Sequence, residues 1–177
     1  MGNVAECLWV TKGSSFTPGP WHAIWLELNT ETFSGSLEII DRLRRETELP
    51  LLLHMLSEEP KESLEIWHEH GIDAMILAWN PFLSPETLRA VRDSGCLCGL
   101  SLVAGARDWV TMIMPLWALL DLVVVEDQKD SNAVADTVRG LASMRKDGQR
   151  PLLGVKSSLA TCDVGPLDLL IRPAPMK

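Results

Sequence analysis

Four ionisable side chains stand at or near the ends of four short apolar runs of the sequence. They are Glu27, His54, Glu126 and Lys156. Two carboxylates, an imidazole and an amine can donate and accept protons, and burial in a dry site brings pKa values toward neutrality. We therefore predict that these four residues catalyse proton transfer on a small carbonyl compound.

Each of these residues also has a structural interpretation. A lone histidine at the end of a buried strand, such as His54, is a hydrogen-bonded structural residue about as often as a functional one. Glu27 stands between two leucines and either faces a lumen or pairs with a neighbouring basic residue. Glu126 and Lys156 can neutralise one another across adjacent strands. The residue pattern alone leaves both interpretations open.

Three further residues follow the last two apolar runs and indicate an anion site. They are Ser157, Ser158 and Arg172. A guanidinium fork and two hydroxyl groups match the hydrogen-bonding geometry of a phosphate. Barrels of alternating strands and helices often bind phosphate after their seventh and eighth strands. We therefore predict phosphate binding by these three residues.

Metal binding has weaker support from the residue types. His54 and Glu27 are the candidate ligands, but one imidazole and one carboxylate leave a divalent ion mostly to water. Cys96 and Cys98 share one face of an apolar run. We interpret them as small buried residues of a reduced core and predict no metal site.

The elements that must position these residues alternate along the whole chain. Most of the apolar runs are apolar on both faces, which is typical of parallel strands buried between a barrel lumen and an outer layer of helices. The predicted strands cover residues 4–10, 22–28, 50–55, 73–79, 96–103, 121–126, 151–156 and 167–172. The predicted helices cover residues 36–47, 60–70, 84–95, 107–120 and 131–147, with Pro115 kinking or shortening the fourth.

This order predicts an α/β fold, a shortened (β/α)8 TIM barrel that occupies residues 1–177 as a single domain. An open, doubly wound sheet would produce the same local pattern, but successive right-handed crossovers favour the closed barrel. Helices are missing near strands 1, 7 and 8, so we expect the outer faces of these strands to be exposed. An exposed apolar seam predicts a homodimer.

Composition and charge exclude several functional classes. The chain has a net charge of -8 and no extended basic window, so we expect no nucleic-acid partner. The first twenty residues lack the basic and apolar regions of a signal peptide, and no apolar run is long enough for a membrane segment. We therefore expect a cytoplasmic protein. Dinucleotide fingerprints, Walker loops and nucleophile elbows are absent from the sequence.

The segment LPLLLHMLSEEPKESLEIWHEHGIDAMI (residues 49–76), with LLDLVVVE at 119–126, resembles the ribulose-phosphate 3-epimerases. The resemblance implies a barrel isomerase that moves a proton on a sugar phosphate with two aspartates, and a divalent metal held by two His and two Asp. Only His54 matches a ligand of that metal directly. The His-x-Asp motif of strand two reads WLE at 25–27, and the Asp-Gly-Gly motif that supplies a catalytic acid reads VKS at 155–157. The ligand set for a divalent metal is thus incomplete.

Two functions are consistent with these observations. The first is a divergent, epimerase-like isomerase or lyase that binds a small phosphorylated sugar. The second is a catalytically inactive barrel that serves as a binding or scaffold protein, which the missing motifs favour.

Overall fold

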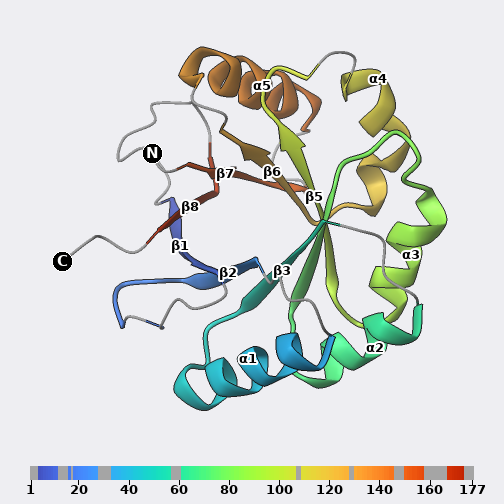
Figure 1. Cartoon of the computed structure of the whole chain (residues 1–177). Helices are drawn as coiled ribbons and strands as arrows, with labels where there is room; N and C mark the ends of the chain where they lie inside the picture. Colours follow the sequence, from blue (N-terminus) through green and yellow to red (C-terminus); the bar gives the residue numbers. More distant parts are fainter. Residues whose placement is uncertain are drawn as a thin grey trace.

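The eight strands form a closed barrel in which every neighbouring pair is parallel, including β8 with β1 (Figure 1). The computed structural model describes residues 4–11, 16, 18–27, 33–56, 61–106, 109–127, 130–145, 150–157 and 167–173. The strands are β1 (Ala5–Thr11), β2 (Ala23–Glu27), β3 (Leu51–Met55), β4 (Ala74–Ala78), β5 (Leu97–Val103), β6 (Leu122–Glu126), β7 (Leu152–Lys156) and β8 (Leu169–Pro173). The helices are α1 (Phe33–Glu46), α2 (Lys61–Glu69), α3 (Pro85–Asp93), α4 (Trp109–Ile113), the 3-10 helix η1 (Met114–Leu119) and α5 (Ser131–Met144). The predicted α/β barrel is confirmed.

Capping residues, glycine and proline explain where the helices begin and end. In α3, the Ser84 hydroxyl accepts a hydrogen bond from the Thr87 amide at 3.2 Å, and Pro85 occupies the first turn. Gly95, with φ of 96°, follows the helix in the left-handed conformation that glycine adopts easily. Pro115 lies where α4 gives way to η1. Because proline cannot donate the helical hydrogen bond, the helix between β5 and β6 is shortened, as predicted.

Alternation along the strands sorts the apolar residues into two clusters. The inner cluster fills the lumen and includes Trp25, Ile76 and Ile171, which are fully buried. The outer cluster lies between the strands and the helices. Because side chains of a strand alternate between its two faces, residues two positions after an inner-cluster residue also face the lumen. Polar residues at the carboxyl ends of the strands therefore converge above this core.

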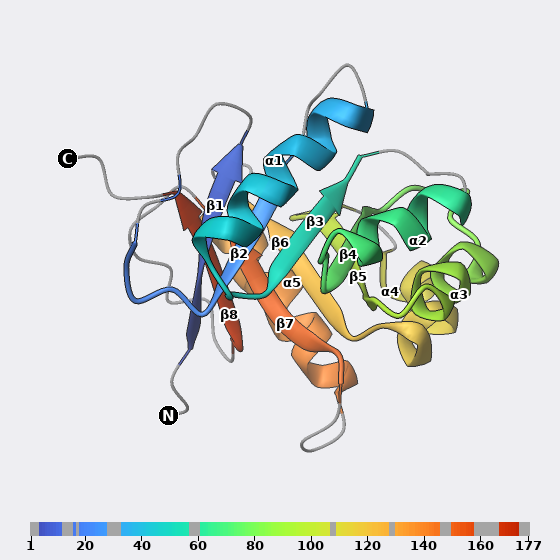
Figure 2. The ribbon, with the colours of Figure 1, turned by 90° about the horizontal axis from the view of Figure 1, so that it is seen from below.

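The outer faces of strands β1 and β7 are buried, so the prediction of an exposed seam was wrong for these two strands, whereas Leu170 and Arg172 on the outward face of β8 are partly exposed. Within the described part of the chain, no helix follows β1, β7 or β8 (Figures 1 and 2). Nevertheless Leu8 and Val10 on β1 are each only 1% exposed, because Phe16 and Trp21 from the β1–β2 connection pack against the same cluster. On β7, Val155 is fully buried and α5 lies against the strand. The homodimer stays a prediction without this support.

A repeated hydrogen bond fixes the amino-terminal ends of the strands. The residue before each even-numbered strand accepts a hydrogen bond from a backbone amide at or next to the start of the preceding odd-numbered strand. In each case a side chain accepts from a backbone amide. The four acceptor side chains and their donor amides are His22 and Glu6 (3.2 Å), Asp73 and Leu51 (2.8 Å), Asp121 and Cys98 (3.0 Å), and Asp168 and Leu153 (2.8 Å). The three aspartates also pair with Arg44, Arg150 and Arg145 respectively. We name these contacts the strand clamps; they stabilise the end of the barrel opposite the polar carboxyl ends.

No helix among the described residues is long and apolar enough to cross a lipid bilayer.

Candidate functional site

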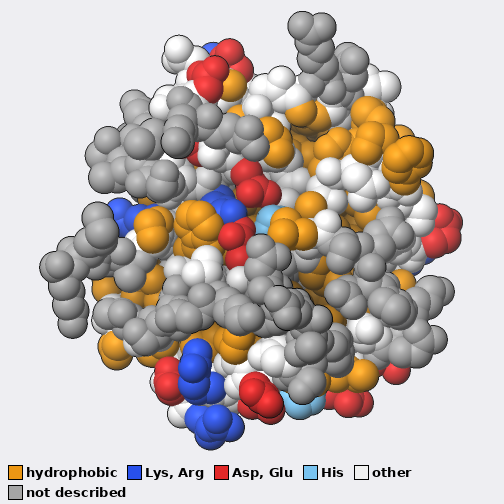
Figure 3. Space-filling view, viewed as in Figure 1, with side chains coloured by type: hydrophobic (Ala, Val, Ile, Leu, Met, Phe, Trp, Pro, Cys, Tyr) orange, Lys and Arg blue, Asp and Glu red, His pale blue; other side chains and the backbone are white. Residues whose placement is uncertain are grey.

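The barrel register brings the four predicted acid/base residues together at the carboxyl ends of four strands. Glu27 lies beside His54 in the β2–β3 pairing, and Glu126 lies beside Lys156 in the β6–β7 pairing. Each stands two residues after a lumen-facing position, so all four side chains point into the mouth of the barrel. Figure 3 shows acidic, basic and histidine side chains gathered at the centre of this face. We call these four residues the mouth cluster.

His54 links the two carboxylates of the mouth cluster. Its side chain is 1% exposed, and Nδ1 lies 3.2 Å from Oε1 of Glu27. Nε2 lies 2.8 Å from the Ser101 hydroxyl and 3.4 Å from Oε1 of Glu126. The imidazole also lies against the indole of Trp25, with 5.0 Å between ring centroids. A buried imidazole that faces a carboxylate on each side can hold a proton for either one.

Glu27 is held as an anion at neutral pH by the donors around it. Its carboxylate accepts hydrogen bonds from Nε1 of Trp9 at 3.1 Å, from Nε1 of Trp25 at 3.3 Å and from Nζ of Lys156. Burial opposes ionisation, but the hydrogen bonds from His54, Lys156 and Trp25 and the charge of Lys156 outweigh it and lower the Glu27 pKa from 4.5 to about 2. A carboxylate this acidic and this well satisfied is a poor base, so its chemistry is to orient and stabilise its neighbours.

Among the described residues, Glu126 has fewer hydrogen-bond donors around it than Glu27, although the two side chains are similarly exposed, at 24% and 20%. Its Oε1 faces His54 and its Oε2 lies 3.2 Å from Nζ of Lys156. The Lys156 ammonium contacts both carboxylates and lies 4.2 Å from the centroid of the Trp9 ring, where a cation–π interaction adds to its pairing. A substrate entering the mouth would therefore meet Glu126 and the ammonium group together.

A divalent metal does not fit beside Lys156 in this arrangement. One ligand atom each from Glu27, His54 and Glu126 lie within 4.8 Å of one another, which is a donor set that transition metals accept. The Lys156 ammonium, however, already contacts both carboxylates and supplies the positive charge that a metal would bring. The ammonium and a metal ion would compete for the same two carboxylates, so no chemical step is assigned to a metal.

The predicted phosphate-binding residues do not join the mouth cluster. Arg172 lies on the outward face of β8, and its guanidinium pairs with Glu6 on the outward face of β1. The Ser157 side chain is buried, and its hydroxyl donates to Oδ2 of Asp127 at 2.8 Å. Ser158 lies outside the described residues. Phosphate binding by these residues stays a prediction.

Two further residues belong to the site. Ser101 reaches His54 from β5, and its place near the carboxyl end of a predicted strand already made it a candidate for the barrel mouth from the sequence. Trp9 was not predicted. Trp9 contacts both Glu27 and Lys156 from β1, whose sequence looks like ordinary core. The β1–β2 pairing places Trp9 near Glu27, whereas its contact with Lys156 on β7 depends on the closure of the barrel.

Comparison with known proteins identifies the fold and leaves the family open. No protein-family model matches the sequence, and no curated protein matches it. The structure is similar to a mutant tryptophan synthase alpha-subunit from Pyrococcus furiosus, with a TM-score of 0.76 at 11% identity over 96% of this chain and 86% of that one. It is also similar to a tryptophan synthase complex from Pyrococcus furiosus (TM-score 0.70, 12% identity, 94% and 86% covered) and to a protein from Aquifex aeolicus VF5 (TM-score 0.68, 11% identity, 95% and 82% covered). These likenesses support the TIM-barrel fold.

Proposed function

We propose that the mouth cluster is the active site of an isomerase or lyase that moves a proton on a small carbonyl substrate. The observation that carries the proposal is the position of His54. Its buried imidazole has a carboxylate at each ring nitrogen, and one of these carboxylates, Glu126, is accessible from the barrel mouth. In TIM-barrel enzymes the chemistry takes place at this end of the strands.

In the proposed reaction, Glu126 removes the proton from the carbon next to the substrate carbonyl. The electron pair of the broken C–H bond moves into the carbonyl and leaves negative charge on its oxygen. The Lys156 ammonium donates a hydrogen bond to that oxygen, which stabilises the developing charge. Return of the proton to the former carbonyl carbon completes an isomerisation when the hydroxyl group on the neighbouring carbon gives its proton to the charged oxygen and becomes the new carbonyl. A positioned base of this kind contributes about 10²–10⁴-fold to the rate.

His54 and Glu27 support this base. Nε2 of His54 faces Oε1 of Glu126, so the imidazole can take up the proton that Glu126 has removed and hold it until it is returned. Glu27 keeps Nδ1 of His54 oriented from the other side. Because the Glu27 pKa is lowered to about 2, Glu27 stays ionised and acts as a positioning residue in this scheme.

A small phosphorylated sugar is the substrate class that we propose, on the strength of the sequence resemblance at residues 49–76. The fold shared with tryptophan synthase alpha-subunits is compatible with catalysis in a barrel of this kind, but it is an argument from fold alone. Ser157 directly follows β7, the strand after which such barrels often bind phosphate.

The test is hydrogen exchange in deuterated water. The purified protein is incubated with pentose and hexose phosphates, and NMR follows the loss of the signal from the proton next to the carbonyl. We expect exchange with the wild type and a loss of at least about a hundredfold in Glu126→Gln. Glu86→Gln, an exposed change on α3, should keep the wild-type rate. Exchange that survives Glu126→Gln, or no exchange with any compound, contradicts the proposal.

A second function, a catalytically inactive binding or scaffold barrel, is favoured by a separate observation. The charged groups of the mouth cluster satisfy one another, with Lys156 bridging both carboxylates. Such a cluster can serve stability alone. This alternative expects no exchange in any variant. It also expects no thermal stabilisation by sugar phosphates, whereas a bound substrate at a hundredfold excess over its dissociation constant adds about 2.7 kcal/mol.

A further inference from the structure

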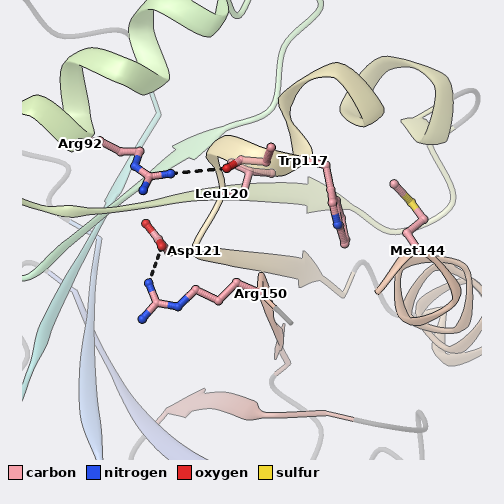
Figure 4. Close-up of a pocket in the computed structure, with 7 residues that line it drawn as sticks. Arg92, Trp117, Leu120, Asp121, Met144 and Arg150 are labelled. Atoms are coloured by element: carbon pink, nitrogen blue, oxygen red, sulfur yellow. Dashed lines mark hydrogen bonds and ion pairs between the residues drawn. The ribbon is translucent and has the colours of Figure 1, made fainter. Parts of the chain in front are cut away.

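A cavity lies at the amino-terminal end of the barrel, opposite the mouth cluster. It has a volume of about 420 Å³ and is bounded by the end of α3, by η1, by the segment before β6, by the end of α5 and by the segment before β7 (Figure 4). This volume is within the range of sites for small organic ligands. The cavity adjoins the short η1 helix, which begins at the position where Pro115 interrupts the regular helix.

One side of the cavity is cationic. Arg92 and Arg150 both line it, and Asp121 is the carboxylate that accompanies them. Asp121 is buried and engaged twice, by the Arg150 guanidinium and by the Cys98 amide in the strand clamp. Two guanidinium groups against one carboxylate leave an excess positive charge here, in a chain whose net charge is -8. An anion is the ligand that this excess favours.

Hydrogen-bond donors of both arginines are available. Within the described part of the chain, Arg92 donates through Nη1 alone, to the carbonyl oxygens of Ala118 and Leu119 at 3.5 and 3.4 Å, which are long contacts. Arg150 donates through Nη1 to Asp121, and its side chain is 64% exposed. Among the described residues, no acceptor engages Nε or Nη2 of either guanidinium. A carboxylate or phosphate can therefore be bound by paired donors from each arginine.

The other side of the cavity is apolar. Trp117 and Met144 line it, and Figure 4 shows them across the cavity from the two guanidinium groups. The indole offers a flat face for an aromatic ring, and the thioether adapts to the shape of a ligand. The arrangement matches a molecule with an anionic group at one end and a flat apolar body at the other.

We propose that this cavity binds a small aromatic anion, with its carboxylate or phosphate between Arg92 and Arg150 and its ring against Trp117. The site is independent of the mouth cluster, since it lies at the opposite end of the strands. Both arginines also have structural roles. Arg150 pairs with Asp121 in a strand clamp, and Arg92 donates from α3 to the last carbonyl groups of η1. The test must therefore separate ligand binding from stability.

The experiment is a calorimetric titration of the full chain with four probes. They are phenyl phosphate, benzoate, inorganic phosphate and the neutral benzyl alcohol. We expect saturable binding of phenyl phosphate or benzoate, at least about tenfold weaker binding of inorganic phosphate, and no binding of benzyl alcohol. The tighter of the two aromatic anions identifies the anionic group that the arginines prefer.

Variants assign the binding to this cavity. Arg92→Gln and Arg150→Gln should each weaken the aromatic anion at least about tenfold, because each removes a charge-assisted hydrogen bond. Arg89→Gln, an exposed change on the same helix as Arg92, should leave affinity unchanged. In the unaltered protein, the indole N–H resonance of Trp117, assigned with Trp117→Phe, should shift on titration. This readout does not depend on how well the arginine variants fold.

Several outcomes would overturn the proposal. These are the absence of saturable binding by either aromatic anion, an affinity for inorganic phosphate equal to that for phenyl phosphate, and a Trp117 resonance that does not move. Binding that both arginine variants retain in full would also overturn it, because the two guanidinium groups would then have only their structural roles.

Discussion

Replacing Glu27 by Gln should destabilise the fold at neutral pH and leave it almost unaffected in acid. The change keeps the size of the side chain but removes the anion that accepts hydrogen bonds from His54, Lys156, Trp9 and Trp25. Lys156 would then pair with one carboxylate instead of two. The expected effect is largest where Glu27 is ionised in both the folded and the unfolded chain.

The magnitude follows from the Glu27 pKa, which is lowered from 4.5 to about 2 in the folded protein. Such a difference corresponds to roughly 3 kcal/mol, and screening of the partly exposed carboxylate by solvent reduces it to about 2 kcal/mol. Because the folded-state pKa is the lower one, this free energy is fully present above pH 4.5 and is lost as the pH falls toward 2. The wild type should therefore lose its advantage over Glu27→Gln within that interval.

The assay is urea unfolding followed by tryptophan fluorescence, at several pH values from neutral to strongly acidic. The difference in unfolding free energy between the wild type and Glu27→Gln should be about 2 kcal/mol at neutral pH and approach zero near pH 2. Glu65→Gln, an exposed change on α2, is the control and should follow the wild type throughout. A difference that stays constant with pH would refute the assignment of this free energy to the ionised Glu27 carboxylate.

Three further predictions concern other parts of the molecule. Lys156→Ala removes the cation between the two mouth carboxylates, so this variant should bind Zn²⁺ or Co²⁺ more tightly than the wild type does in a calorimetric titration. Equal affinities would show that the ammonium does not compete with a metal. Asp121→Asn breaks the ion pair of one strand clamp and should lower the unfolding free energy by about 1–3 kcal/mol in a urea titration, and an unchanged midpoint would contradict the clamp's contribution. Burial raises the pKa of Cys7 above its usual range, that of Cys96 to about 11 and that of Cys98 to about 12. These three thiols should therefore resist a thiol reagent at pH 8 until the protein is unfolded. Rapid labelling of any of the three in the native chain, located by peptide mapping, would be inconsistent with their burial.

Much of the fold could be predicted because its signals are local. The two-sided apolar runs marked all eight strands, and capping residues such as Ser84 marked helix boundaries. Pro115 acts through its own missing amide, so the shortening of its helix was also predictable. The error about the outer faces has a different origin. A missing helix is visible in the sequence, but the packing of Phe16 and Trp21 against the outer cluster that includes Leu8 is not.

The candidate site, too, could be predicted only in part. Alternation along the strands and the parallel order were enough to place Glu27, His54, Glu126 and Lys156 at one end of the barrel, since each is the last or the next-to-last residue of its own strand. The partners of these residues were predicted only in part. The pairing of Glu126 with Lys156 was one interpretation of the sequence and is present in the structure. The sequence did not identify Lys156, 129 residues away, as the basic partner of Glu27.

The sequence by itself determined which residues form strands, which strands are parallel and which polar side chains share the mouth of the barrel, because these depend on period, propensity and chain order. Only the tertiary structure decided how those side chains are ionised and paired. Closure of β8 onto β1 brings Lys156 on β7 within reach of Glu27 on β2 and of Trp9 on β1, and the contact with Lys156 helps to lower the Glu27 pKa and places a cation between two carboxylates. Electrostatic energies change over a few ångströms, and such distances exist only once the barrel has closed.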